Sequence, residues 1–260
     1  MKLCLLCGSG TEVRFKRQVL HQYEVSYFYC DQCGLMQTEK PYWLKEAYHD
    51  AIVAADTGVV SRNLFFQRQV AVVLNFLFDG KGCYLDYGGG YGLFTRLMRD
   101  VGFDFYWQDP YCENLFARGF SSTEAMEPFK AVTCFEVMEH IEHPLEFVTK
   151  CLEESECRTF IFSTELMQNP PPEPDAWHYY LFNTGQHISF YQERTLRLMA
   201  KKLKMTFVSH GNLHLFTDQK INETHFRHLT GRFNSLRFFW LRRRNTSLMI
   251  SDHEKVSRGR

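Results

Sequence analysis

CYLDYGGGYGLFTRLMRD, residues 83–100, is the stretch that decides the fold of this chain. An apolar run predicts a strand over residues 82–87, and an amphipathic run predicts a helix over residues 91–101. Between them stand four glycines within five residues: Gly88, Gly89, Gly90 and Gly92. A strand, a glycine-rich turn and a helix in direct succession are typical of the edge at which a doubly wound α/β sheet binds its ligand.

The glycine pattern excludes two common phosphate-binding motifs. A dinucleotide fingerprint that starts at Gly88 needs a third glycine where Leu93 stands, and no Lys-Ser/Thr pair of a P-loop follows. The sequence instead reads D-x-G-x-G-x-G from Asp86. Asp109 ends the next expected strand, where a carboxylate accepts hydrogen bonds from both hydroxyls of a ribose. This favours a nucleoside with an amino-acid tail as ligand; the alternative is a tight corner without a ligand.

The rest of the chain alternates between the two-residue apolar period of strands and the 3.6-residue apolar period of helices. Strands are expected at 103–109, 131–137, 158–164, 204–210 and 212–218, and helices at 61–78, 111–117, 145–154 and 191–203. The segment HGN, residues 210–212, reads as a hairpin turn between the last two strands. We expect an α/β fold with a doubly wound, mostly parallel sheet and one antiparallel hairpin.

The first 35 residues carry a separate signal, made of two C-x2-C pairs. Four thiolates on two tight turns complete a tetrahedral shell without an open position, which is how structural zinc is held. A redox-active pair is the alternative, but two copies at this spacing favour metal. We therefore predict a small zinc ribbon, and so short a segment needs the metal to fold. Its ligands are Cys4, Cys7, Cys30 and Cys33.

Chain length and composition limit the class of protein to which this sequence can belong. The chain has 260 residues, enough for one α/β core with a small satellite. Nine cysteines are an odd number for a disulfide framework, and we see no secretory signal and no apolar run long enough to span a bilayer. We expect a cytoplasmic protein with four parts: a ribbon over 1–38, a helical connector that completes the cofactor pocket over 39–80, the main domain over 81–220 and a C-terminal segment over 221–260.

That C-terminal segment is basic and aromatic. From residue 225 onward nine Lys/Arg face two Asp/Glu, although the whole chain has a formal net charge of zero. Two interpretations stay open. Either the aromatics pack on the core and the arginines are solvated, or the segment meets a phosphorylated or lipid-linked partner, peripheral to the inner face of a membrane.

The stretches YLDYGGGYG and CFEVMEHIEHP resemble the first and fourth motifs of class I S-adenosylmethionine-dependent methyltransferases. With the four cysteines and GQHISFY, the chain is similar to bacterial methyltransferases of sugar and surface-polysaccharide biosynthesis. The resemblance implies a seven-stranded Rossmann-like sheet, S-adenosyl-L-methionine as methyl donor and S-adenosyl-L-homocysteine as product. It assigns the methionine moiety to Asp86, Gly88 and Gly90, the ribose to Asp109, and the surroundings of the sulfonium to Phe135 and Glu136.

Methyl transfer to a hydroxyl requires a positioned acceptor and a base that removes its proton. Histidine is the natural base near neutral pH. The resemblance places His187 in the loop that covers the acceptor, so it is the first candidate, and His140 is the second. Each also fits a histidine that only ties down its own loop. Trp177, Tyr179 and Tyr180 stand in the same long loop, where their rings could stack on a sugar or pack on the sheet.

The leading hypothesis is O-methylation of a small-molecule or glycan acceptor, namely a nucleotide-linked, lipid-linked or polymeric bacterial sugar. C-methylation of a keto-sugar is a close variant. Modification of RNA is the rival, because a zinc ribbon and an arginine-rich tail can follow a phosphate backbone. Zero net charge and the few basic residues of the ribbon make nucleic acid the weaker partner. A non-catalytic binding protein is a third class.

Overall fold

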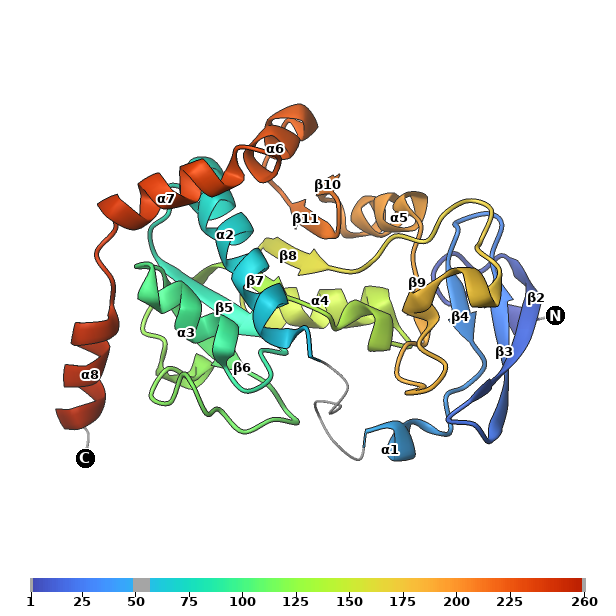
Figure 1. Ribbon diagram of the computed structural model, residues 1–260. Coiled ribbons are helices and arrows are strands. Elements are labelled where there is room, and N and C mark those ends of the chain that lie inside the picture. Colours follow the sequence, from blue (N-terminus) through green and yellow to red (C-terminus); the bar gives the residue numbers. More distant parts are fainter. Residues whose placement is uncertain (1, 49–56, 259–260) are drawn as a thin grey trace.

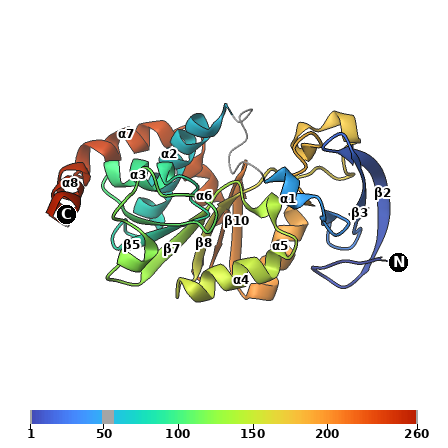
Figure 2. The same cartoon turned by 90° about the horizontal axis from the view of Figure 1, so that it is seen from below.

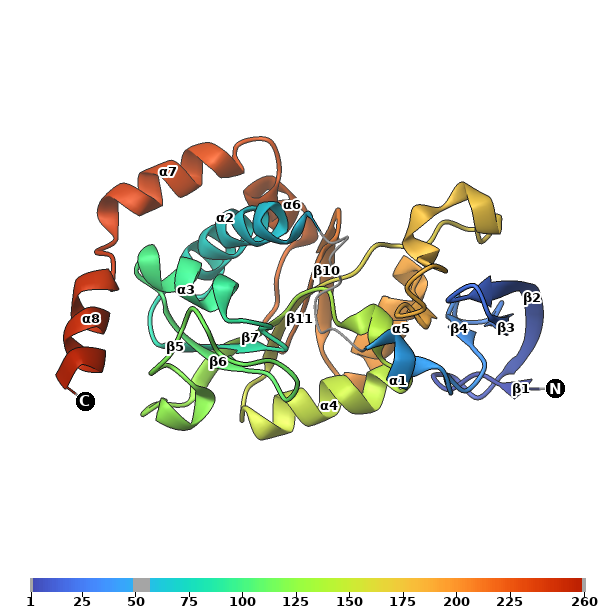
Figure 3. The same ribbon diagram turned by 60° about the horizontal axis from the view of Figure 1, so that its bottom comes forward.

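The computed structural model describes residues 2–48 and 57–258. They form a large α/β unit with a smaller β-rich unit beside it (Figure 1). The small unit and the C-terminal helix lie at opposite ends of the molecule (Figure 3). Residues 49–56 of the expected connector lie outside the described part. The division into four parts stays a prediction.

The large unit is organised around a sheet with the strand order β10-β11-β8-β7-β5-β6. Strands β5, β6, β7 and β8 run parallel, whereas β11 is antiparallel to both of its neighbours. The mostly parallel sheet with one antiparallel hairpin is therefore confirmed. The strands are β5 Cys83–Tyr87, β6 Asp104–Gln108, β7 Phe129–Cys134, β8 Thr159–Ser163, β10 Thr206–His210 and β11 Leu213–Thr217.

Both faces of the sheet are apolar, so helices cover both. In β8, Phe160 and Phe162 belong to one core cluster and Ile161 to the other, as the two-residue period of a strand requires. Helices α2 (Val59–Leu77), α3 (Leu93–Asp100) and α6 (Glu223–Thr230) pack on one face, and α4 (Pro144–Glu154) and α5 (Glu193–Leu203) on the other (Figure 2). Helix α7 (Asn234–Arg244) packs against α2, and α8 (Met249–Arg258) follows it. No described helix combines the length and apolar character needed to cross a bilayer.

Three expected elements differ. The described sheet has six strands rather than seven, because Ser121 makes only an isolated parallel bridge to Trp107 at the edge beyond β6. The helix expected at 111–117 is absent from the described structure. The Asp109 and Asn114 side chains accept backbone N–H groups there and so compete with helix formation. Helix α2 begins at Val59, two residues before the expected cap at Ser61.

The small unit is an antiparallel sheet with the order β1-β2-β3-β4-β9. Its first four strands come from the N-terminal region, but β9 comes from the loop that precedes α5, and its Phe190 pairs with Met36 of β4. The bounds are β1 Lys2–Leu3, β2 Gly10–Val19, β3 Tyr23–Tyr29, β4 Met36–Thr38 and β9 Ser189–Phe190, and the short helix α1 spans Leu44–Ala47. Four 3-10 turns cover Ser122–Glu124, Met138–His140, Pro174–Ala176 and His178–Tyr180.

The two units are joined tightly through α5. The Thr195 hydroxyl donates to the Cys33 carbonyl over 2.7 Å, and Arg194 donates to the Tyr29 hydroxyl over 2.6 Å. Gly34 has a φ of +77°, which favours glycine, and an added Cβ would lie 2.4 Å from Oε1 of Gln192 and displace that side chain. The small unit therefore has a fixed position beside the carboxyl ends of the parallel strands.

Candidate cofactor and acceptor site

The glycine loop connects β5 to α3 through left-handed backbone. Gly88 and Gly90 have φ values of +73° and +53°, a conformation that glycine adopts without steric cost. The two differ in their surroundings. An added Cβ at Gly88 would lie 2.9 Å from Val137, whereas at Gly90 it would meet nothing within 4 Å. The Cα side of Gly90 is thus open to a ligand.

Two residues at the end of β6 hold this loop. The Gly90 N–H donates to Oδ2 of Asp109 over 2.9 Å, and the Trp107 indole donates to the Gly90 carbonyl over 2.8 Å. Oδ1 of Asp109 accepts the N–H groups of Tyr111 and Cys112 over 2.8 and 2.9 Å. A carboxylate has about four lone-pair sites, so one is left for a further donor. Trp107 was not among the predicted site residues, although its place at a strand end was a usable signal.

Asp86 lies beneath the loop and faces inward. Its carboxyl group is 2% exposed and accepts hydrogen bonds from the hydroxyls of Thr95 and Thr133, each over 3.1 Å. Burial raises the pKa of Asp86 to about 7. At Gly89 an added Cβ would lie 2.6 Å from Oδ2 of Asp86. This carboxyl group therefore supports the turn from the protein side.

Phe135 and Glu136 follow directly after β7. The Phe135 ring stacks on Phe66 of α2, with centroids 4.3 Å apart. Glu136 has a φ of +55°, which is uncommon outside glycine. Its N–H donates to the Ser163 hydroxyl over 2.8 Å, that hydroxyl donates back to Oε1 over 2.7 Å, and Arg62 lies 3.4 Å from Oε2. A strained residue held in this way is typical of a functional edge.

The structure brings His140 and His187 together, with ring centroids 4.9 Å apart. Nδ1 of His140 lies 3.0 Å from the Gln186 carbonyl, and Nδ1 of His187 lies 2.7 Å from the Tyr179 carbonyl. Because a carbonyl only accepts, both Nδ1 atoms carry hydrogen and both Nε2 atoms are bare in the neutral rings. Burial lowers the pKa of His140 to about 4 and that of His187 well below its usual range, so both rings are neutral.

Glu139 completes this cluster; its place beside His140 in the sequence had suggested that it could orient or charge-stabilise an imidazole. It is fully buried, and its Oε1 lies 3.9 Å from Nε2 of His187. Neither carboxyl oxygen has a hydrogen-bond partner among the described residues. Burial is the main cause that raises the pKa of Glu139 to about 8, and the nearby Glu136 carboxylate adds to the rise. The Tyr179 hydroxyl partly offsets this rise, although it does not reach hydrogen-bond geometry. The neighbouring E-H dipeptide was the only signal for it.

The aromatic loop differs from a sugar-stacking lid. Tyr179 and Tyr180 are buried in a core cluster with Tyr27 and Phe190 of the small sheet. The Tyr180 hydroxyl donates to the Pro172 carbonyl over 2.9 Å, which fixes the loop on itself. Burial of these large aromatic rings stabilises the junction of the two units. The faces of the Tyr179 and Tyr180 rings therefore contact the protein and are not available to stack on a sugar.

The four N-terminal cysteines have the geometry of a zinc site. All four sulfurs lie within 4.8 Å of one another, and the pairs Cys4–Cys33 and Cys7–Cys30 are each 3.5 Å apart. Tetrahedral Zn–S bonds of about 2.3 Å place the sulfurs about 3.8 Å apart. The cluster therefore fits a structural zinc ion.

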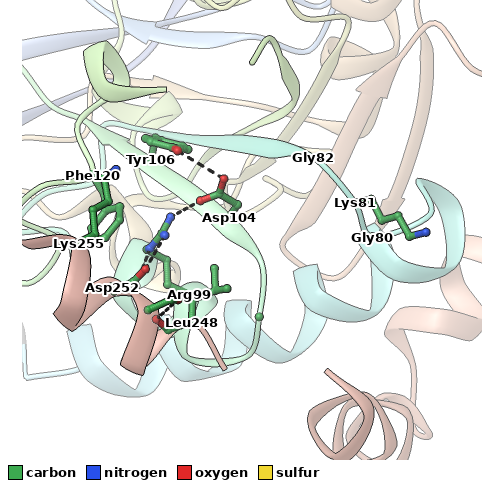
Figure 4. Close-up of a pocket in the computed structure, with 12 residues that line it drawn as sticks. Gly80, Lys81, Gly82, Arg99, Asp104, Tyr106, Phe120, Leu248, Asp252 and Lys255 are labelled. Atoms are coloured by element: carbon green, nitrogen blue, oxygen red, sulfur yellow. Dashed lines mark hydrogen bonds and ion pairs between the residues drawn. The ribbon is translucent and has the colours of Figure 1, made fainter. Parts of the chain in front are cut away.

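A cavity of about 490 Å³ lies at the opposite edge of the sheet, where β5 and β6 begin. Figure 4 shows Arg99 there, between Asp104 of β6 and Asp252 of α8. The Arg99 guanidinium also lies 3.6 Å from the centre of the Phe120 ring. This cavity marks the docking place of α8 and is separate from the glycine loop.

The sequence matches a family model described as a methyltransferase domain over residues 62–210, more than half of the chain. The chain belongs to this methyltransferase family. The matched span includes the glycine loop, Asp109 and the cluster of Glu139, His140 and His187. A search of curated proteins finds no match to this sequence.

Several solved structures resemble this methyltransferase distantly. TnmH is 19% identical, with 68% of this chain and 60% of TnmH covered and a TM-score of 0.49. An O-methyltransferase family 2 protein from Planctomyces limnophilus, in complex with apigenin, is 15% identical, with 64% and 63% covered and a TM-score of 0.44. Magnesium protoporphyrin IX methyltransferase from Synechocystis, with bound SAH, is 13% identical, with 66% and 90% covered and a TM-score of 0.41. The chain thus spans less than two thirds of the first two, and likeness at this level says nothing about the acceptor.

Proposed function

We propose that this chain transfers the methyl group of S-adenosyl-L-methionine to a hydroxyl of a carbohydrate acceptor. One observation carries the proposal: Gly90, Asp109 and His140 follow the carboxyl ends of the neighbouring parallel strands β5, β6 and β7, and His187 lies beside His140. A methyl donor with a nucleoside and an amino-acid tail suits Gly90 and Asp109. An acceptor that must lose a proton suits the histidine pair.

For the donor, the proposed contacts follow the sequence prediction. Gly88 and Gly90 offer backbone to the methionine moiety, and the open side of Gly90 supports this. Asp109 receives the ribose through the lone-pair site that its three backbone bonds leave available. Phe135 and Glu136 flank the sulfonium at the end of β7. Asp86 acts from beneath, by supporting the loop that carries these contacts.

The reaction is an in-line displacement. The acceptor oxygen forms a bond to the methyl carbon while the carbon–sulfur bond breaks, and the electron pair stays on sulfur to give S-adenosyl-L-homocysteine. The hydroxyl proton passes to a base, for which His187 and His140 are the candidates. His187 is 7% exposed and its Nε2 faces Glu139, whereas His140 is more exposed and its Nε2 has no hydrogen-bond partner among the described residues. These contacts favour His140.

The carbohydrate class rests on the resemblance of the motifs to sugar methyltransferases. A C-methyltransferase of a keto-sugar would use the same neutral histidines on a carbon acid. The exposed face of α7 supports a lipid-linked or phosphorylated acceptor near a cytoplasmic membrane face: Phe239 and Trp240 are 55% and 46% exposed, beside three exposed arginines at 242–244. Nucleic acid remains the weaker alternative, because the whole chain has a formal net charge of zero and the cysteine-rich segment has few basic residues.

Calorimetric titration of the full chain with S-adenosyl-L-methionine, S-adenosyl-L-homocysteine and NAD tests the proposal. We expect both adenosyl ligands to bind and NAD not to bind. Asp109→Ala should weaken binding by tenfold or more, because it removes the proposed ribose contact and the anchor of Gly90; the exposed Asp218→Asn is the control. Binding of neither adenosyl ligand would refute the function. A panel of nucleotide sugars, glycans and RNA, followed by methyl incorporation, then identifies the acceptor.

A further inference from the structure

The cluster of Glu139, His140 and His187 contains a buried carboxyl group that nothing described around it satisfies. Glu139 is 0% exposed, and both of its oxygens are without a hydrogen-bond partner in the described structure. Buried carboxyl groups are normally hydrogen-bonded, paired with a cation or bound to a metal, because the uncompensated group is costly to bury. The described chain supplies no such partner, so an ion or a water molecule is the group that would satisfy Glu139.

The two histidines are oriented as metal ligands are. Each donates its Nδ1 hydrogen to a backbone carbonyl, of Gln186 or Tyr179, which fixes the tautomer with a bare Nε2. Ligating histidines in proteins are held in this way, by a carbonyl or carboxylate on the other nitrogen. The same arrangement leaves both Nε2 atoms available to one ion.

The donor atoms are also close enough to share one ion. One ligand atom from each of the three residues lies within 4.8 Å of the others, and Nε2 of His187 is 3.9 Å from Oε1 of Glu139. Neighbouring ligands at about 2.1 Å from a zinc ion are about 3.4 Å apart in a tetrahedron. The pair of Glu139 and His187 therefore needs to shorten by about 0.5 Å, and no pair by more than about 1.4 Å.

We propose that Glu139, His140 and His187 bind a divalent metal ion, zinc by preference, in the acceptor pocket. Two histidines and one carboxylate form a known catalytic zinc set that leaves a position open. The proposal rests on the proposed function and changes one step of it. A hydroxyl bound at the open position loses its proton to bulk water more readily, and the oxygen then attacks the methyl carbon as before. A histidine whose Nε2 holds the ion does not itself accept the proton.

Metal content of the full-length protein, measured after dialysis against zinc and then against metal-free buffer, tests the site. We expect two zinc ions per chain: one on the four cysteines and one on this cluster. Glu139→Gln and His140→Gln should each reduce the content to one. His143→Gln is the matched control and should keep two, because this exposed histidine stands outside the cluster.

Each outcome decides the proposal. One zinc in the wild-type protein, or two in both cluster variants, would overturn it. Circular dichroism identifies a variant that fails to fold, and His140→Gln then replaces Glu139→Gln because its ring is only partly buried. The titration with adenosyl ligands separates the two proposals: adenosyl binding with one zinc leaves the histidine base, whereas two zinc ions without adenosyl binding leave the metal site and refute the methyl donor.

Discussion

Asp86 is a residue whose position in the sequence points to a ligand and whose side chain points into the protein. It is 2% exposed and is held by the hydroxyls of Thr95 and Thr133. Burial raises its pKa to about 7, so the folded protein keeps a proton that the unfolded chain releases near pH 4. Its direct contact with the methionine moiety stays a prediction.

The raised pKa of Asp86 predicts a pH dependence of stability. Between about pH 4 and pH 7 the folded state binds more protons at this residue, so its contribution to the free energy of unfolding falls as the pH rises. The slope is at most about 1.4 kcal/mol per pH unit. Asp86→Asn removes this titration, so urea unfolding across that range should show the variant gaining on the wild-type protein as the pH rises. Parallel stability curves would contradict the prediction.

At the scale of elements, α8 is held to the sheet by a buried ionic contact. Arg99 of α3 donates to both carboxylate oxygens of Asp252, over 2.8 and 2.7 Å, and also pairs with Asp104. Arg96 adds a second cation 2.8 Å from Asp252. Removing one partner of a buried pair leaves the other uncompensated, which costs more than the intact pair contributes.

Asp252→Asn should therefore destabilise the protein by about 3 kcal/mol and loosen α8 first. We expect faster hydrogen exchange and faster proteolysis over residues 249–258. Adenosyl-ligand affinity should be unchanged, because this contact lies at the opposite edge of the sheet. Glu254→Gln, on the exposed side of the same helix, is the control. Equal exchange rates in α8 of the two variants would show that the ion pairs do not hold the helix.

At the scale of the whole molecule, the small unit positions His187, one of the two proposed bases. His187 stands two residues before β9, and β9 is a strand of the small sheet through its pairing with β4. The cysteine cluster packs in the same core cluster as Leu196 and Met199 of α5. We therefore expect the predicted structural zinc to affect the position of His187, because it stabilises the sheet that β9 joins.

Cys33→Ser should remove the zinc ion of the four cysteines and reduce methyl transfer more than tenfold. Adenosyl affinity should stay within about twofold, because the glycine loop depends on β5 and β6 instead. Metal analysis, calorimetry and turnover of the same preparation measure the three effects. Cys112→Ser, outside the cluster, is the control. Full turnover in the zinc-depleted variant would show that the small unit does not position the pocket.

The sequence by itself determined the class of the fold and most of its elements. The period of apolar residues predicted α4 and β5 each to within one residue, and the glycine between two strand-like runs predicted the hairpin at Gly211. These signals are local: apolar periodicity, helix caps and glycine turns depend on residues close together in the sequence and need no distant partner. The four-cysteine set was predictable for the same reason, because each pair sits on one tight turn.

Only the tertiary structure decided which side chains meet and which are buried. It replaced the expected helix at 111–117 with turns capped by Asp109, and it reduced the seventh strand to a bridge at Ser121. It brought His140 beside His187, paired β9 with β4 and enclosed Glu139 without a partner. The physical reason is that burial and long-range strand pairing depend on segments far apart in the chain. A local sequence pattern does not specify which distant segment will pack against it.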